Sequence, residues 1–278
     1  MNKFMAIIAA AGSLAGASMS STTAASAGEV LDKVLGTKTL TVAVGTDWGE
    51  MSFLNDKHEL DGYGVAVAKA VAERLGVQAQ FVTPGWDVIV ASNWQARWDL
   101  AMYMTPTKAR AEKFDFPAVY FYEPVLAAAH KNSQATKLSD LGGKVVGVAS
   151  NTAGESYVNR TLKPDWIGAQ PVQFQFDPGE VKTYASTNIA LDDLRLGDGV
   201  RLDAVLSSGP ILRGAIKSGY PLKELDGIAF YAPSAIVAQR DDKEFSDKIA
   251  AAVQSMRDGG TLSQLSIKWY GVDYTSQK

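Results

Sequence analysis

The spacing of apolar and polar positions alternates between strand-like and helical along the first part of the chain. Thr39–Val44 is an apolar and β-branched run, which predicts a buried strand. Over Tyr63–Leu75 the apolar residues recur at helical spacing as far as Gly76, which predicts a helix that stops there. The next predicted elements are a strand at Gln78–Val82, a helix at Asp87–Ala96 and a strand at Asp99–Met104. Strands that alternate with helices in this way predict βαβ units and a parallel sheet.

The same alternation starts again in the second part of the chain. Leu138–Leu141 leads into a predicted strand at Lys144–Val148, and a helix is predicted after Asn151–Gly154, through Tyr157. The further strand and helix candidates are Val172–Phe176, Ser186–Leu194, Ala204–Leu206 and Ile211–Lys217. The chain therefore contains two successive α/β series.

Two extended apolar and aromatic stretches, Tyr120–Ala129 and Ile228–Ala238, follow the first and the second series. We expect each stretch to cross from one lobe to the other, and the second to precede helices at Phe245–Arg257 and Leu262–Trp269. This pattern predicts an α/β fold of two lobes joined by two extended crossovers, with a cleft that can close around a small ligand. The predicted boundaries assign residues 28–125 and 232–278 to lobe 1 and residues 126–231 to lobe 2.

The N-terminal segment, residues 1–27, has the three-part layout of a secretory signal peptide. Lys3 precedes an apolar stretch, polar residues follow, and small residues stand at Ala25 and Ala27. The apolar stretch is too short to span a bilayer of about 30 Å, so we do not expect a membrane anchor. We predict cleavage after Ala27 and export to a bacterial periplasm.

Composition narrows the chemistry that the chain can perform. Its 278 residues include no cysteine and two histidines, His58 and His130, so thiolate nucleophiles, iron–sulfur clusters and His-rich metal sites are not expected. The formal charge is −3, with 27 basic and 30 acidic side chains, which argues against nucleic acid and anionic membranes as partners. The composition favours ligand binding without a metal or cofactor over catalysis.

Several short motifs occur in an order that is typical of one family. They are Val44–Asp47, Leu60–Tyr63, Gly85–Asp87, Trp98–Arg110, Phe114–Pro117, Leu141–Val148, Leu202–Leu206 and Asp258–Gly271. With them, the chain resembles the periplasmic polar amino-acid-binding proteins of ABC importers over Thr37–Val272. The resemblance implies the two-lobed periplasmic-binding-protein type II fold. It also implies a monomer that captures a small carboxylate-bearing ligand and delivers it to a membrane permease.

Arg110 is the predicted anchor for the ligand carboxylate. A guanidinium can hold a carboxylate through two parallel hydrogen bonds, and the Thr105 hydroxyl is close enough in sequence to complete the cradle. The resemblance implies this role for Arg110. The alternative is a surface arginine paired with Glu112 or Asp115.

A second contact to the same carboxylate is expected from the other lobe. The segment Asn151–Gly154 opens a helix, and free N–H groups in a first helical turn attract anions. The resemblance implies that Thr152 and the backbone of Ala153 meet the ligand there. Thr152 can also act as an ordinary helix N-cap, and the two roles are compatible.

Trp86 is the predicted aromatic wall of the cleft. The resemblance places an aromatic ring here against the ligand side chain, and its face would also attract a cationic ligand. The alternative for Trp86 is packing within the protein, which is what we expect of Trp94, Trp98 and Trp269.

The acidic residues near the cleft depart from the family pattern. Where the family usually has an acidic residue for the ligand ammonium, this chain has Ser207 and Ser208. A neutral hydroxyl cannot offset a buried ammonium. Either Asp47 or Glu50, on the loop after the first strand, supplies that charge, or the ligand is not a standard α-amino acid. The alternative for both carboxylates is a solvated acidic loop.

Tyr103 is a second departure, because small residues are usual at this place in the family. Its phenol would enter the cleft, where it would reduce the volume or add a hydrogen-bond donor.

Two other functions are compatible with the sequence. One is an exported enzyme on the same fold, similar to the cyclohexadienyl dehydratases, with Glu50 or Glu155 as its general acid. The other is a sensor domain that signals to a partner protein. We expect binding and transport, not catalysis.

Overall fold

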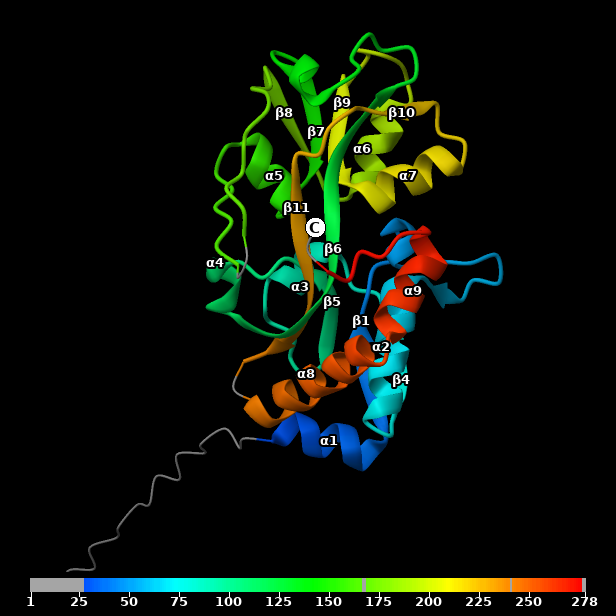
Figure 1. Ribbon diagram of the computed structural model, residues 1–278, viewed down its shortest axis with the longest axis vertical. Coiled ribbons are helices and arrows are strands. Elements are labelled where there is room, and N and C mark those ends of the chain that lie inside the picture. The colour runs from blue at the N-terminus through cyan, green and yellow to red at the C-terminus, as the bar shows by residue number, and fades with distance from the viewer. Residues whose placement is uncertain (1–27, 167–168, 241, 277–278) are drawn as a thin grey trace, which may run out of the picture.

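A single sheet of nine strands runs through both halves of the molecule (Figure 1). The computed structural model describes residues 28–166, 169–240 and 242–276, so the predicted signal peptide, residues 1–27, lies outside the described residues. The strand order is β4-β1-β5-β11-β6-β9-β7-β8, and β10 pairs with β6. The strands are β1 Thr39–Ala43, β4 Gln78–Val82, β5 Leu100–Met104, β6 Phe114–His130, β7 Val145–Ala149, β8 Glu180–Tyr184, β9 Ala204–Ser208, β10 Leu222–Glu224 and β11 Phe230–Gln239.

Helices cover this sheet, and several of them begin at a side-chain cap. The helices are α1 Glu29–Thr37, α2 Tyr63–Arg74, α3 Trp86–Val90, α4 Lys108–Ala111, α5 Ala153–Val158, α6 Thr187–Leu194, α7 Gly209–Lys217, α8 Lys243–Asp258 and α9 Thr261–Tyr270. Short elements complete the described chain: the 3-10 turns η1 Gly49–Met51 and η2 Leu138–Leu141, and the hairpin β2 Phe53–Leu54 and β3 Leu60–Asp61. The N-caps that accept a hydrogen bond from a first-turn amide are Thr107, Thr152, Ser186 and Asp242.

Each half of the sheet is parallel, and two long antiparallel strands join the halves. β1 pairs in parallel with β4 and β5, and β7 pairs in parallel with β8 and β9. The two predicted crossovers are β6 and β11, which pair with each other from Phe230↔Val125 to Gln239↔Phe114. Figure 1 shows these two strands side by side through both halves. The α/β class and the two extended crossovers that the sequence predicts are confirmed.

The hydrophobic core divides between the two halves. One cluster of buried side chains draws on residues 31–121 and 236–274, and two smaller clusters draw on residues 125–232. We use lobe 1 for the half built around the first cluster and lobe 2 for the half built around the other two. Along β6, Phe121 belongs to the lobe 1 cluster and Val125 to a lobe 2 cluster.

The strand candidate at Val172–Phe176 is wrong. This segment forms no strand, and the edge of β7 pairs instead with Glu180–Tyr184, which the sequence analysis did not single out. Alternate residues of the segment do point inward, because Phe174 and Phe176 pack against Tyr157 at centroid distances of 5.2 and 6.0 Å. The alternation thus reflects aromatic packing without ladder hydrogen bonds.

The predicted helix at Asp87–Ala96 is too long. Helix α3 ends at Val90, and Ser92, Gln95 and Ala96 all have positive φ angles, which a helix cannot accommodate. Trp94 lies in this loop and not on a helix, and its side chain is fully buried. Its indole N–H donates to the carbonyl of Ile89 at 2.9 Å. Burial of one large ring therefore ends the helix early.

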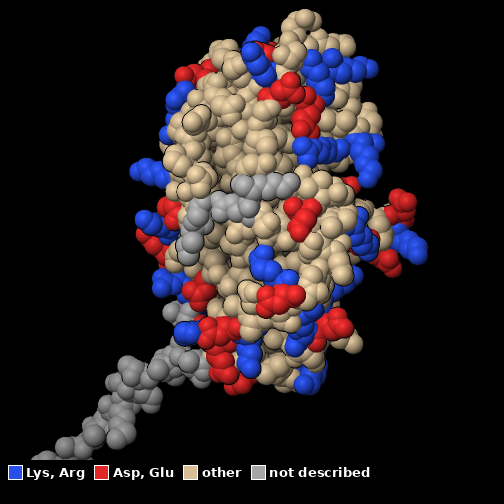
Figure 2. Space-filling model, viewed as in Figure 1, with Lys and Arg blue, Asp and Glu red and all other residues tan. Residues whose placement is uncertain are grey.

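The face shown in Figure 2 intermixes acidic and basic side chains and does not gather them into a single patch. This agrees with the nearly balanced count of charges. Across the described residues, we find no helix whose length and apolar character would let it cross a membrane.

Candidate functional site

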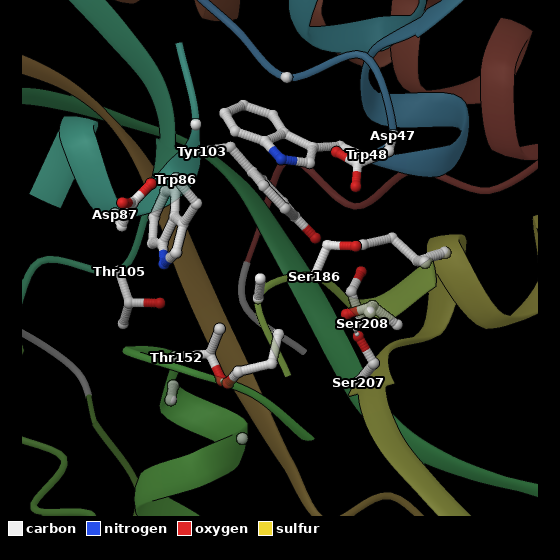
Figure 3. Close-up of a pocket in the computed structure, with 18 of the residues that line it drawn as sticks. Asp47, Trp48, Trp86, Asp87, Tyr103, Thr105, Thr152, Ser186, Ser207 and Ser208 are labelled. Atoms are coloured by element: carbon white, nitrogen blue, oxygen red, sulfur yellow. Dashed lines mark hydrogen bonds between the residues drawn. The ribbon is translucent and has the colours of Figure 1, made fainter. Parts of the chain in front are cut away.

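A cavity of about 360 Å³ lies between the lobes, where strand ends and helix starts from both lobes converge (Figure 3). Carboxyl ends of parallel strands are the usual place for a ligand site in α/β sheets. The lining from lobe 1 is Gly45, Thr46, Asp47, Trp48, Thr83, Pro84, Gly85, Trp86, Asp87, Tyr103, Thr105 and Arg110. Lobe 2 and the crossovers add Glu123, Val125, Ala149, Thr152, Ala153, Gly154, Ala185, Ser186, Thr187, Ser207, Ser208, Ile211 and Ala232.

Most of the predicted site residues meet in this cavity. The ones that line it are Asp47, Trp86, Tyr103, Thr105, Arg110, Thr152, Ala153 and Ser208. Glu50 is not among the lining residues, because its carboxylate pairs with Lys217 of lobe 2 at 3.0 Å. The contacts that each residue makes to a ligand stay predictions.

Arg110 is a half-buried cation whose guanidinium donates hydrogen bonds to backbone carbonyls. Its Nη1 donates to the carbonyl of Thr105 at 3.0 Å, and its Nη2 donates to the carbonyl of Asn151 in lobe 2 at 2.6 Å. Its guanidinium also lies 5.8 Å from the centroid of the Trp86 ring. Burial lowers the pKa of Arg110 to about 10, which leaves it protonated at neutral pH. No ion pair joins Arg110 to a carboxylate in the described part of the chain, including Glu112.

Aromatic rings from three lobe 1 segments form one wall of the cavity. Trp48 lies 5.9 Å from Trp86 in an edge-to-face arrangement and 5.5 Å from Tyr103. Figure 3 shows the three rings gathered on one side of the pocket. The buried indole Nε1 of Trp86 has no hydrogen-bond partner among the described residues. Trp48 was missed by the sequence analysis, although it directly follows the predicted Asp47.

Thr152 caps helix α5 at the lobe 2 wall. Its hydroxyl accepts a hydrogen bond from the Glu155 amide at 3.1 Å and donates to the carbonyl of Ala149 at 2.7 Å. The N-cap role considered for Thr152 is therefore present. Its carboxylate-binding role, shared with the backbone of Ala153, stays a prediction.

Glu123 is the main residue that the sequence analysis missed. It lies on β6 with 7% of its surface exposed, and its Oε2 accepts hydrogen bonds from the hydroxyls of Tyr103 and Ser208. The Ser234 hydroxyl donates to Oε1 at 3.5 Å. Burial raises the pKa of Glu123 to about 7, against the opposing effect of these hydroxyl donors. A lone acidic residue inside the otherwise apolar Tyr120–Ala129 crossover was the available signal.

Tyr103 reaches Glu123 through an unusual backbone conformation. Its φ is +70°, inside the strand β5, a region that non-glycine residues rarely occupy. Such a conformation costs of the order of 1–3 kcal/mol and is found where the surrounding structure imposes it. The hydrogen bond from the phenol to Glu123 is one contact that holds this side chain in place.

The two lobes touch one another outside the cavity as well. The Lys108 amide of lobe 1 donates to both carboxylate oxygens of Asp165 at 3.0 Å. A Cβ on Gly49, whose φ is +57°, would lie 2.9 Å from the Cα of Ile211 in lobe 2. With the contact between Lys217 and Glu50, these approaches describe lobes in direct contact.

Metal binding finds no support in the described residues, where no three His, Cys, Asp or Glu side chains group as metal ligands would.

Comparisons with known proteins agree with this fold. The chain is 29% identical to the L-cystine-binding protein TcyJ of Escherichia coli over 250 residues, 88% of each chain. It is 28% identical to the arginine-binding extracellular protein ArtP of Bacillus subtilis over 239 residues, 84% of this chain and 87% of the other. The structure superposes with a TM-score of 0.73, at 23% identity, on the ancestral amino acid-binding protein AncCDT-1, a precursor of cyclohexadienyl dehydratase, covering 86% and 99% of the two chains.

A family model also matches residues 40–272, which include every residue that lines the cavity. That model describes bacterial extracellular solute-binding proteins, family 3. The protein belongs to this family.

Proposed function

We propose that the protein captures an amino acid, or a close derivative with a carboxylate, and delivers it to the permease of an ABC importer. The observation that carries this proposal is Arg110, a half-buried guanidinium that lines the cavity and has no carboxylate partner among the described residues. A guanidinium at a partly desolvated site attracts a carboxylate that can pair with it, so the site favours an anionic group. The relatives named for cystine and arginine support an amino acid as the carrier of that group.

Ligand binding and closure of the lobes are coupled in this proposal. A carboxylate held by Arg110 on lobe 1 and by the Thr152 turn on lobe 2 touches both sides of the cleft. Such a ligand binds the closed arrangement better than the open one and shifts the population toward it. The closed form would then dock on the permease. The two core regions would move as the predicted lobes, with hinges near residues 125 and 232.

The proposed place of work is the bacterial periplasm. Membership of an extracellular family supports export. The predicted signal peptide, residues 1–27, would direct export and be removed after Ala27. The mature chain would act as a monomer and without a cofactor.

The enzyme alternative rests on a different residue from those first considered. Glu50 and Glu155 do not line the cavity, whereas Glu123 does, and its pKa is raised to about 7. A carboxyl group with such a pKa is suited to general acid chemistry. Incubation of the protein with prephenate and arogenate separates the two functions, because turnover would support the enzyme and its absence would favour binding alone.

The test of the proposed function is a ligand screen on the mature chain. The panel comprises the twenty protein amino acids, L-cystine, close amino acid derivatives and small organic acids, tested first by thermal shift and then by calorimetry. We expect at least one member to raise the melting temperature and to bind with one-to-one stoichiometry. If no member of the panel binds, the proposed function is wrong.

A further inference from the structure

Glu123 contacts both lobes and both crossover strands. It lies on crossover β6, and its carboxylate receives hydrogen bonds from Tyr103 on β5, Ser208 on β9 and Ser234 on β11. β5 belongs to lobe 1, β9 to lobe 2, and β11 is the other crossover. The carboxylate therefore sits where both lobes and both crossovers meet, and it lines the cavity.

The groups that face Glu123 are neutral hydroxyls. Besides its hydrogen-bond donors, the titratable groups that interact with it electrostatically are the phenols of Tyr120, on its own strand, and Tyr270, on α9. No basic side chain forms an ion pair with Glu123 within the described residues. Burial of a carboxylate without a cation costs free energy. A cationic group placed beside Glu123 would offset this cost.

The charge of the whole cavity lining also favours a ligand with a cationic group. Among the described residues that line the cavity, the acidic ones are Asp47, Asp87 and Glu123, and Arg110 is the single basic one. A ligand that carried only a carboxylate would neutralise Arg110 and leave the acidic excess in place. A ligand with a cationic group as well would complement both kinds of charge.

We propose that Glu123 binds the ammonium group of the ligand, so that the cation site lies on the hinge strand β6 and not at the end of β9. This inference rests on the proposed function. Ser208, which cannot supply the charge itself, instead donates to Glu123 and orients its carboxylate. Tyr103 does the same from lobe 1.

Proton release is the distinctive consequence of this arrangement. Burial raises the pKa of Glu123 to about 7 in the free protein, so below that pH the group carries a proton. An adjacent ammonium favours the charged carboxylate and lowers this pKa. Binding therefore releases the Glu123 proton to solvent below about pH 7. Affinity should rise about tenfold per pH unit up to pH 7 and level off above it.

The experiment is calorimetry with the tightest-binding member of the amino acid panel. At pH 6 and pH 8, each titration is repeated in two buffers whose ionisation enthalpies differ. We expect release of about one proton at pH 6 and of almost none at pH 8. The analogue of that ligand without its α-amino group should bind without proton release. Equal proton counts for ligand and analogue overturn the inference.

A variant series provides the second measurement. Glu123→Gln keeps the size and hydrogen-bonding capacity of the side chain, and we expect binding at pH 8 to weaken by at least about 30-fold. Its affinity should no longer depend on pH between 5.5 and 7.5. Glu59→Gln removes the same charge from the exposed loop between β2 and β3 and should leave affinity and proton release unchanged.

The outcomes separate this inference from the proposed function. If an amino acid binds wild type and Glu123→Gln equally well, Glu123 is not the cation site, and the proposed function stands. If no panel member binds wild type, both are wrong. If Glu123→Gln does not fold, as judged by circular dichroism, the proton count on wild type decides.

Discussion

The two walls of the cavity differ in kind. The lobe 1 wall carries large aromatic rings and the one guanidinium of the described lining: Trp48, Trp86, Tyr103 and Arg110. The lobe 2 wall consists of small residues and hydroxyls around the starts of α5, α6 and α7, where Thr187 and Ser207 hydrogen-bond to each other at 2.9 Å. Lobe 1 therefore offers the ligand a positive charge and a large aromatic surface. Lobe 2 offers hydroxyls and backbone groups that complete the site when the lobes close. The difference predicts an order of events, with the ligand engaging lobe 1 before closure.

The strongest test of this asymmetry is Arg110→Ala. Removal of a cation that would pair with the ligand carboxylate inside the closed cleft should weaken binding by at least about 100-fold, since loss of one partner of such a charge pair costs several kcal/mol. Calorimetry with the ligand identified in the screen measures this loss. Arg195→Ala, which removes an exposed arginine from lobe 2, is the matched control. An affinity within threefold of wild type for Arg110→Ala would show that lobe 1 does not anchor the carboxylate.

The lobe 2 counterpart is Thr152→Ala, with a smaller expected effect. Loss of this N-cap should lower the free energy of unfolding by about 1 kcal/mol and weaken binding by a few-fold, because the Ala149–Ala153 turn loosens. Urea unfolding and calorimetry report the two quantities. Thr152→Ser retains the hydroxyl and should restore both. A loss of affinity as large as that of Arg110→Ala would contradict the asymmetry between the walls.

The contact between the lobes outside the cavity should matter least. Lys217 is 79% exposed in its ion pair with Glu50, so Glu50→Gln should change affinity by less than about threefold. Because salt screens an exposed pair, the difference from wild type should vanish at about 1 M salt. Titrations at low and high salt measure this, with Lys217→Gln as the reciprocal variant. A large, salt-independent loss would instead give Glu50 a direct role in binding.

Local pattern accounted for most of the fold. Apolar runs and helical spacing located β1, α2, β4 and the two crossovers, because their residues face a core with a regular period. The errors arose where one side chain overrode the pattern. Trp94 ends α3 by filling the lobe 1 core, and Phe174 packs on Tyr157 without joining a strand.

The sequence predicted those site residues that come soon after the end of a strand. Arg110 and Thr152 stand in such places, and both line the cavity. Glu123 lies in mid-strand, and its setting depends on hydroxyls that are 20, 85 and 111 residues away. Glu50 illustrates the reverse case, since its position after β1 suggested the cavity while Lys217 holds its carboxylate elsewhere.

The shared sheet has a consequence for attempts to divide the protein. Strand β6 pairs with β9 of lobe 2 and also with β11, which pairs with β5 of lobe 1. Cutting the chain between the lobes would therefore leave a row of unpaired backbone N–H and C=O groups on each fragment. Exposed strand edges of this kind recruit other chains, so each isolated lobe should be prone to aggregate. The hinge strands therefore also cover the strand edges of each half.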